Sequence, residues 1–265
     1  MSELNDAQRE AVHRIMAASL SAHGYLKATG IMHLDEILNE YTGKTNMEWD
    51  TDNYWFHLYG TPDPAGTWAW KLEGHHVSLN FTFHEGRSWV TPMFLGSNPG
   101  TVRKEDWTGW RILGEEEDLG FLLLNAFDEE QRKRVIVSEE ILKDLILLPG
   151  AGDRLQEKRG LPARDMTDRQ RDLLLRVLQQ YVDNVQYELA VEQLDRIEAG
   201  GFDDIYFSWV GPTDPAADSY YYALDGPNFT IEYDNFENHV HTVWHGRGSN
   251  YGDDVLEAHY RGERH

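Results

Sequence analysis

Two histidines separated by a single residue, His239 and His241, are the side chains of this sequence best suited to metal chemistry. They lie in a segment rich in β-branched and aromatic residues, which predicts a strand, and alternate residues of a strand point to the same side. The two imidazoles are then about 7 Å apart at the backbone, close enough for both to bind one divalent cation. Glu232, which a short turn places on the preceding strand, supplies a carboxylate. We therefore expect these three side chains to form a metal site with open coordination positions.

A site of two histidines and one carboxylate suits two kinds of chemistry, hydrolysis at Zn(II) and oxygen activation at Fe(II). The chain has no cysteine, which excludes thiolate ligands, thiolate nucleophiles and disulfides. Any two histidines with one residue between them meet the same spacing, however. The competing interpretation is therefore that this face of the strand is an ordinary solvated surface, as is common in antiparallel sheets.

The first half of the chain offers a further histidine in a similar setting. In the strand predicted over residues 76–83, His76 and Asn80 alternate with apolar residues and share a polar face. His76 is a candidate fourth ligand or proton-transfer group, and Asn80 is a candidate for orienting a substrate. Arg247, in a glycine-rich segment over residues 246–252, could bind a substrate carboxylate through two hydrogen bonds. The histidines interpreted as packing or surface residues are His13, His23, His33, His57 and His75, while His245 and His259 stay open.

The composition of the chain excludes some classes of binding partner for this site. The formal net charge is −22, from 46 acidic and 24 basic residues, and such a surface repels nucleic-acid phosphates and anionic lipids. No segment has the apolar length of a membrane span, and the N-terminal residues have no signal-peptide pattern. We therefore expect a cytoplasmic protein that acts on a small molecule and binds neither nucleic acid nor membranes.

The spacing of apolar residues predicts which elements carry these side chains. Helical periodicity covers residues 4–40 and 173–197, and shorter helices are predicted at 116–127, 129–148 and 253–260. The acidic run 115–118 is interpreted as a partner of a helix dipole. Strands rich in aromatic residues follow each long helical run; the predicted strands are 54–59, 67–72, 76–83, 88–94, 205–210, 219–224, 228–234 and 239–244.

Several motifs occur twice in the same order. Residues 4–10 correspond to residues 166–172, and the turn at residues 60–65 corresponds to that at residues 211–216. The grouping of helices and strands predicts an α+β fold made of two related helix-plus-antiparallel-meander halves with pseudo-twofold symmetry. We place the first half at residues 1–150 and the second, with the His-x-His strand, at residues 151–265, packed as one compact unit.

The chain also resembles an uncharacterised family found in bacteria and fungi, domain of unknown function 3500. The resemblance rests on residues 72–81, 91–99, 232–235 and 238–244, and on a C-terminal signature over residues 251–256 and 259–260. It covers nearly the whole chain. Because the family brings no activity with it, the resemblance supports the motifs without assigning them a reaction.

On the residues alone we expect a divalent-metal-dependent enzyme, a hydrolase in which the metal activates water. His239, His241 and Glu232 would bind zinc or iron, with His76 as an added ligand and Asn80 or Arg247 orienting the substrate. Two alternatives stay open. One is a non-haem Fe(II) oxygenase with the same ligands, and the other is a non-catalytic protein that binds a metal or small ligand.

Overall fold

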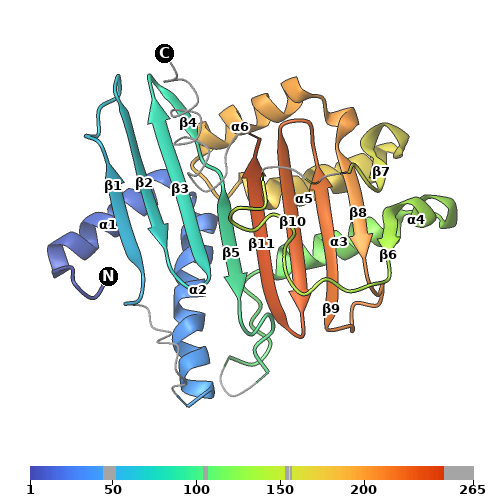
Figure 1. Cartoon of the computed structure of the whole chain (residues 1–265), viewed down its shortest axis with the longest axis horizontal. Helices are drawn as coiled ribbons and strands as arrows, with labels where there is room; N and C mark the ends of the chain where they lie inside the picture. The colour runs from blue at the N-terminus through green and yellow to red at the C-terminus, as the bar shows by residue number, and fades with distance from the viewer. Residues whose placement is uncertain (44–51, 104–106, 153–154, 156, 248–265) are drawn as a thin grey trace.

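The computed structural model describes residues 1–43, 52–103, 107–152, 155 and 157–247. Its centre is one 11-stranded sheet to which both halves of the chain contribute (Figure 1). The strands are β1 (Trp55–Tyr59), β2 (Thr67–Glu73), β3 (Val77–His84), β4 (Arg87–Trp89), β5 (Met93–Ser97), β6 (Ile136–Ser138), β7 (Leu161–Pro162), β8 (Tyr206–Val210), β9 (Ser219–Asp225), β10 (Phe229–Phe236) and β11 (His239–Gly246).

The strands follow the order β1-β2-β3-β5-β11-β10-β9-β8-β6 across the sheet, with β4 paired to β3 and β7 paired to β8. Neighbouring strands are antiparallel except β6 and β8, which are parallel. The two halves meet at the centre of the sheet, where β5 pairs with β11. The predicted α+β class with antiparallel meanders is confirmed.

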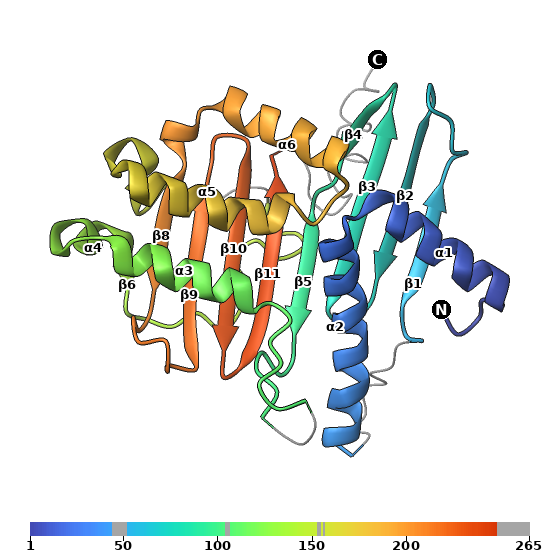
Figure 2. The same ribbon diagram turned by 180° about the vertical axis from the view of Figure 1, so that it is seen from behind.

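Among the described residues, the α-helices lie on one face of this sheet, with α4 at its β8 edge (Figure 2). The helices α1 and α2 cover the strands of the first half, and α3, α5 and α6 cover those of the second. None of the helices within the described ranges is long and apolar enough to cross a membrane. The helices are α1 (Asp6–Ser19), α2 (Ala22–Tyr41), α3 (Gly114–Ala126), α4 (Glu129–Val135), α5 (Asp168–Val182) and α6 (Tyr187–Gly200), with 3₁₀ turns at Ala163–Asp165 and Phe202–Asp204.

Each long helical run of the sequence is a pair of helices. The run at residues 4–40 divides into α1 and α2 because Leu20 is extended and Ser21 caps the second helix, accepting a hydrogen bond from the amide of Gly24 at 3.0 Å. The run at residues 173–197 likewise divides into α5 and α6. The two interruptions contact each other, because Leu20 between α1 and α2 forms an antiparallel bridge with Val185 between α5 and α6. The helical spacing of apolar residues does not show this contact, since it joins distant parts of the chain.

The helix predicted over residues 129–148 is wrong beyond Val135. After α4 the chain becomes extended, because Ile136 and Ser138 pair with β8. Residues 139–152, which we call the cover segment, then run across the face of β8–β11 opposite the helices (Figure 1). The strand predicted over residues 88–94 is also divided, into β4 and β5, around a cis Thr91–Pro92 bond. The predicted helix at residues 253–260, His259 and residues 248–252 lie outside the described residues.

Strand alternation sorts the side chains as the sequence predicts. In β3 and β11 the residues Val77, Leu79 and Val240 enter the core under the helices. His239 and His241 therefore point to the opposite side, which we call the outer face. The cover segment packs on this face over β8 and β9, where Leu142 contacts the cluster of Val210, Tyr221 and Ala223.

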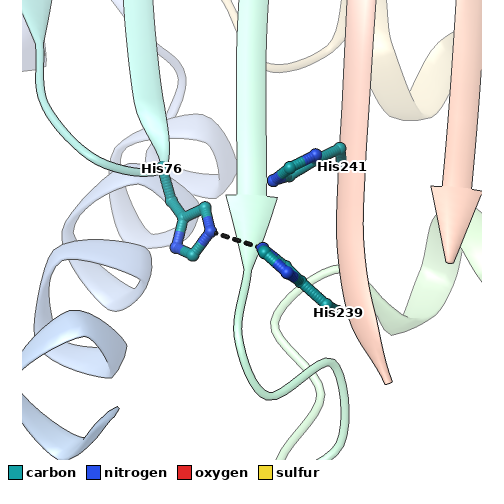
Figure 3. Close-up of side chains that lie close together, drawn as sticks. All are labelled: His76, His239 and His241. Atoms are coloured by element: carbon teal, nitrogen blue, oxygen red, sulfur yellow. Dashed lines mark hydrogen bonds between the residues drawn. The ribbon is translucent and has the colours of Figure 1, made fainter. Parts of the chain in front are cut away.

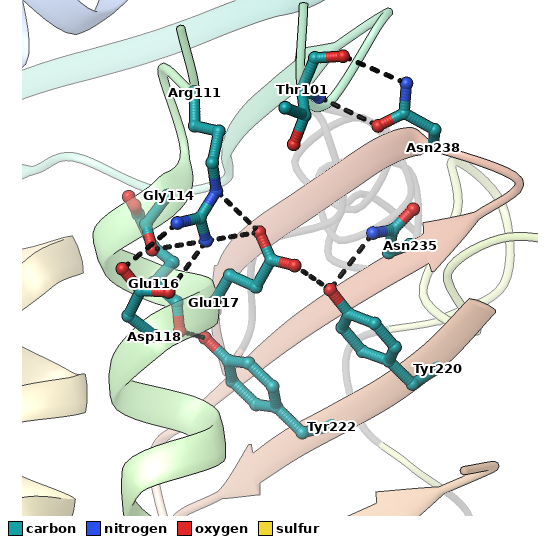
Figure 4. A network of polar contacts seen from close by, with 10 residues as sticks. All are labelled: Thr101, Arg111, Gly114, Glu116, Glu117, Asp118, Tyr220, Tyr222, Asn235 and Asn238. Atoms are coloured by element: carbon teal, nitrogen blue, oxygen red, sulfur yellow. Dashed lines mark hydrogen bonds and ion pairs between the residues drawn. The ribbon is translucent and has the colours of Figure 1, made fainter. Parts of the chain in front are cut away.

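A second set of polar side chains lies on the helical side of the sheet, at the start of α3. Lys27 and Glu116 form an ion pair of 2.5 Å with almost no solvent exposure (3% and 1%). Glu117 binds Arg111 and accepts a hydrogen bond from Tyr220 (Figure 4). The acidic run 115–118 thus does more than face the helix dipole, because two of its carboxylates have specific buried or partly buried partners.

Candidate metal centre

Three imidazoles from both halves of the chain meet on the outer face. His76 immediately precedes β3, while His239 and His241 lie on β11, and β5 passes between them (Figure 3). One ring nitrogen from each histidine lies within 4.8 Å of the others. The Nε2 atoms of His76 and His239 are 2.9 Å apart and share a hydrogen bond. This group of histidines could hold a metal ion.

Gly96 makes this convergence sterically feasible. It lies on β5 directly opposite His241 in the strand register. A Cβ atom at this position would lie 2.6 Å from Cδ2 of His76 and 3.0 Å from Cδ2 of His241. Any larger residue would therefore push one or both rings away from the cluster.

The turn before β11 sets the position of His239. Glu237 and Asn238 both have positive φ (53° and 67°) and connect β10 to β11 as a two-residue hairpin turn. The Asn238 side chain accepts from the amide of Thr101 at 2.8 Å and donates to the Thr101 carbonyl at 3.1 Å (Figure 4). The turn is therefore fastened to the segment that follows β5, and His239 begins its strand in a defined register.

A buried carboxylate on α2 orients His76. Asp35 Oδ1 lies 3.0 Å from Nδ1 of His76 and 3.1 Å from Nδ1 of His75, and the Tyr54 hydroxyl donates to Asp35 Oδ2. Burial raises the pKa of the Asp35 carboxyl, but the hydrogen bonds from His75, His76 and Tyr54 outweigh it and hold the pKa below its usual value. Because Nδ1 of His76 donates to this carboxylate, its Nε2 presents a lone pair to the cluster.

A second carboxylate orients His241 in the same way. Asp144, on the cover segment, lies 2.8 Å from Nδ1 of His241 through Oδ1. The amide of Leu145 also donates to Asp144 at 2.8 Å. Burial raises the pKa of Asp144, but its hydrogen bonds with His241 and with the amide of Leu145 help to lower it, and the net pKa is below its usual value. Carboxylates on Nδ1 that leave Nε2 for the ion are the usual outer partners of zinc-binding histidines.

Two of the three imidazoles are in the protonation state that metal binding needs. Burial lowers the pKa of His76 to about 4. Burial, together with His241 and His76, lowers the pKa of His239 to about 3. Both rings are therefore neutral at pH 7, and neutral imidazole is the form that binds cations. Because Nδ1 of His76 donates to Asp35, the proton between the two Nε2 atoms belongs to His239, and a cation would replace it.

The structure does not bring Glu232 into this cluster. Its buried carboxylate accepts hydrogen bonds from the amides of Ile146 (2.7 Å) and Leu147 (2.9 Å) and from the hydroxyl of Tyr221 (2.8 Å). Glu232 thus anchors the cover segment two residues after Asp144 instead of facing the histidines. The register explains the difference, because Asp234 is the residue opposite His241 on β10.

The other predicted residues also lie apart from the three imidazoles. Asn80 shares the outer face, but its amide donates to the carbonyl of Pro92 at 2.7 Å and to Ser78. Arg247 follows the far end of β11 and forms an ion pair with Asp225. Six residues were predicted to bind metal or assist catalysis. Three of them, His76, His239 and His241, form the cluster, and the other three do not.

Sequence reasoning missed both supporting carboxylates and assigned His75 to simple packing. Asp35 carried a usable signal, because it is an acid within the apolar helical run of Ile31, Leu34 and Leu38. An acid at such a position needs a buried partner. Asp144 carried none, since it lies in a segment whose pattern predicted a helix.

Removing the carboxylate beside His241 should weaken the site without emptying it. If the cluster holds a divalent cation, with zinc as the probe, we expect Asp144→Ala to lower its affinity about 10–100-fold, because the ring of His241 loses the partner that fixes its tautomer and orientation. Competition with a chromophoric zinc chelator measures the change. Glu140→Ala, an exposed acid of the same cover segment, is the control and should leave the affinity unchanged; equal affinities for both variants would contradict an orienting role.

A substitution at Glu232 separates the observed site from the one predicted by sequence. In Glu232→Gln, the amide nitrogen cannot accept a hydrogen bond, so one of the donors on Ile146, Leu147 or Tyr221 loses its acceptor. We expect a loss of about 1–3 kcal/mol in unfolding free energy with zinc stoichiometry retained. Urea unfolding and metal analysis measure the two quantities. A folded variant that binds no zinc would instead make Glu232 a ligand.

Comparison with known proteins identifies the family of this chain but finds no matching curated protein or solved structure. The model of a family described as "protein of unknown function (DUF3500)" matches residues 1–253. No curated protein and no solved structure matches the chain. The candidate chemistry therefore depends on the geometry of the cluster itself.

Proposed function

We propose that this chain, which belongs to the DUF3500 family, is a zinc-dependent hydrolase whose ion is held by His76, His239 and His241. One observation carries the proposal: three imidazoles converge, and in two of them Nδ1 is hydrogen-bonded to a carboxylate, so that Nε2 is left for an ion.

The donor set favours zinc over iron. Three histidine ligands with a remaining open position are typical of catalytic zinc, whereas non-haem Fe(II) oxygenases use two histidines and a carboxylate. Glu232, the carboxylate that would complete the iron set, is already occupied by three hydrogen-bond donors. Asp35 and Asp144 form hydrogen bonds with Nδ1 of His76 and of His241, respectively, so these carboxylates orient the rings and do not face the ion.

A zinc ion bound at three histidines lowers the pKa of its water to about 7 and polarises a carbonyl group. The residues of this chain would hold that ion and expose one side of it. His76 is buried, but His239 and His241 are only partly buried on the outer face, so a small substrate could approach from there. The net charge of −22 disfavours polyanionic substrates.

The test uses the full chain purified without an affinity tag, stripped of metal with a chelator and reloaded with zinc or iron. We expect zinc-loaded protein to hydrolyse a chromogenic ester such as p-nitrophenyl acetate, with kcat/KM lost on stripping, restored by zinc and absent in His241→Ala. Three outcomes contradict the proposal. They are equal turnover by stripped protein, oxygen consumption with iron alone, and tightly held zinc with no exchangeable water and no turnover, which would indicate a binding protein.

We also propose that the chain consists of two copies of one unit, related by a pseudo-twofold axis and divided near residue 150. Two features support this. Each half has a helix pair followed by four antiparallel strands of the main sheet order, to which the first half adds the short β4, and the strand order runs outward from β5 and β11 in both directions. An experimental structure tests it: the halves should superpose element by element, with His76 equivalent to Asn228. A superposition that pairs the elements in any other order would contradict duplication.

A further inference from the structure

The first strand of the sheet is an edge that lacks the usual protections. Within the described part of the chain, β1 pairs only with β2, through five consecutive residue pairs without a bulge. Its sequence, Trp-Phe-His-Leu-Tyr, contains no lysine and no proline. Natural proteins protect sheet edges with such residues or with bulges, because an open row of amides and carbonyls recruits further strands.

The side chains of this edge are apolar and exposed. Trp55, Leu58 and Tyr59 are 57%, 48% and 54% exposed, respectively. None of the five residues is an aspartate, glutamate, lysine or arginine, although the chain as a whole has a net charge of −22. Apolar residues concentrated on a strand edge of an otherwise acidic surface are typical of an interaction site.

The pattern of β1 is complementary to itself. Trp55, His57 and Tyr59 point to the outer face, while Phe56 and Leu58 point to the helical side, where Phe56 stacks on Trp70 at 5.9 Å between ring centroids. If two copies of the strand run antiparallel about a twofold axis at position 57, every pair is matched. An aromatic residue then faces an aromatic residue, and an apolar residue faces an apolar one.

We propose that β1 is a homodimer interface, in which two copies of this chain join their sheets edge to edge. Trp55 would lie opposite Tyr59 of the partner subunit, and Phe56 opposite Leu58 of the partner subunit. His57 would lie opposite His57 of the partner subunit, on the twofold axis. The pairing satisfies the outward-pointing backbone groups of both strands and covers their apolar side chains, the two features that mark the edge.

The dimer is tested by sedimentation velocity on the full chain. We expect wild-type protein to sediment as a dimer, and Leu58→Lys to raise the dimer dissociation constant about tenfold or more, because lysine is a natural blocker of strand edges. Leu122→Lys, a leucine of similar exposure (44%) on α3, is the matched control and should remain dimeric. Circular dichroism confirms that both variants fold.

The register is tested by a single cysteine, since the natural chain has none. Directly opposite residues of antiparallel strands have Cα atoms about 4.5–5.5 Å apart, which a disulfide can span. His57→Cys should therefore form a covalent dimer on mild oxidation, while Leu122→Cys should not. The proposal is overturned by a monomeric wild type, by a dimer that survives Leu58→Lys, or by a His57→Cys protein that does not cross-link.

Discussion

Replacing His241 by alanine is expected to lower zinc affinity by about a thousandfold or more, on the order of 4 kcal/mol of binding free energy. The variant loses one of three converging imidazoles and leaves Asp144 without the ring that it orients. His239→Ala should have a similar effect, because its Nε2 is the atom closest to His76. Equilibrium dialysis followed by metal analysis should give about one zinc per wild-type chain and almost none for either variant.

A surface histidine provides the matched control for these variants. His84, at the end of β3, is half-exposed, and its contacts are with Glu85 and with Thr67 on the paired strand β2, far from the three imidazoles. We expect His84→Ala to keep full zinc stoichiometry. His241 is partly exposed in the folded chain, so His241→Ala should retain the circular dichroism of the wild type. If wild type and His241→Ala bound zinc equally well, the three histidines would not be the metal site.

The largest expected effect on stability is at the buried ion pair of Lys27 and Glu116. Lys27→Met should lower the unfolding free energy by about 3–5 kcal/mol, because the carboxylate of Glu116 is left buried without its cation. Lys27 contacts Oε1 of Glu116, and Oε2 has no hydrogen-bond partner among the described residues. Such a loss is a large share of the about 5–15 kcal/mol typical of folded domains. Urea unfolding of the metal-free protein measures it.

The double variant Lys27→Met/Glu116→Met shows whether the single variant loses stability because Glu116 lacks its partner or because the core packing is damaged. Because two apolar side chains often replace a buried ion pair with little cost, we expect the double variant to recover most of the lost stability. Both variants should retain zinc binding, since the pair lies on the helical side of the sheet and the histidines lie on the outer face. A single variant within about 1 kcal/mol of wild type would show that the pair does not stabilise the fold.

Local sequence patterns predicted the parts of this site that depend on a single strand. The period-2 alternation placed His239 and His241 on one face, and it placed His76 on the polar side of its own strand. The capping boxes at Asn5, Asp128 and Thr167, which begin α1, α4 and α5, are likewise formed by residues three positions apart. These features need only neighbouring residues, which is why they can be recognised without a structure.

The features that were missed depend on contacts between distant segments. His76 was expected as an added ligand although it lies 163 residues from His239, but the carboxylates that orient the rings were not expected. Asp35 approaches His76 from a helix, and Asp144 approaches His241 from the cover segment, 97 residues away in the chain. The cover segment has a helical pattern, yet its amides of Ile146 and Leu147 bind Glu232 instead of helix carbonyls. Tertiary hydrogen bonds thus overrode the local preference and removed Glu232 from the predicted ligand set.

A crystal grown with zinc and measured at the zinc absorption edge tests the central claim most directly. We expect one strong anomalous peak on the outer face, about 2.0–2.1 Å from Nε2 of His76, His239 and His241. A map without a peak at that place, or with the three rings turned away from one another, would contradict it.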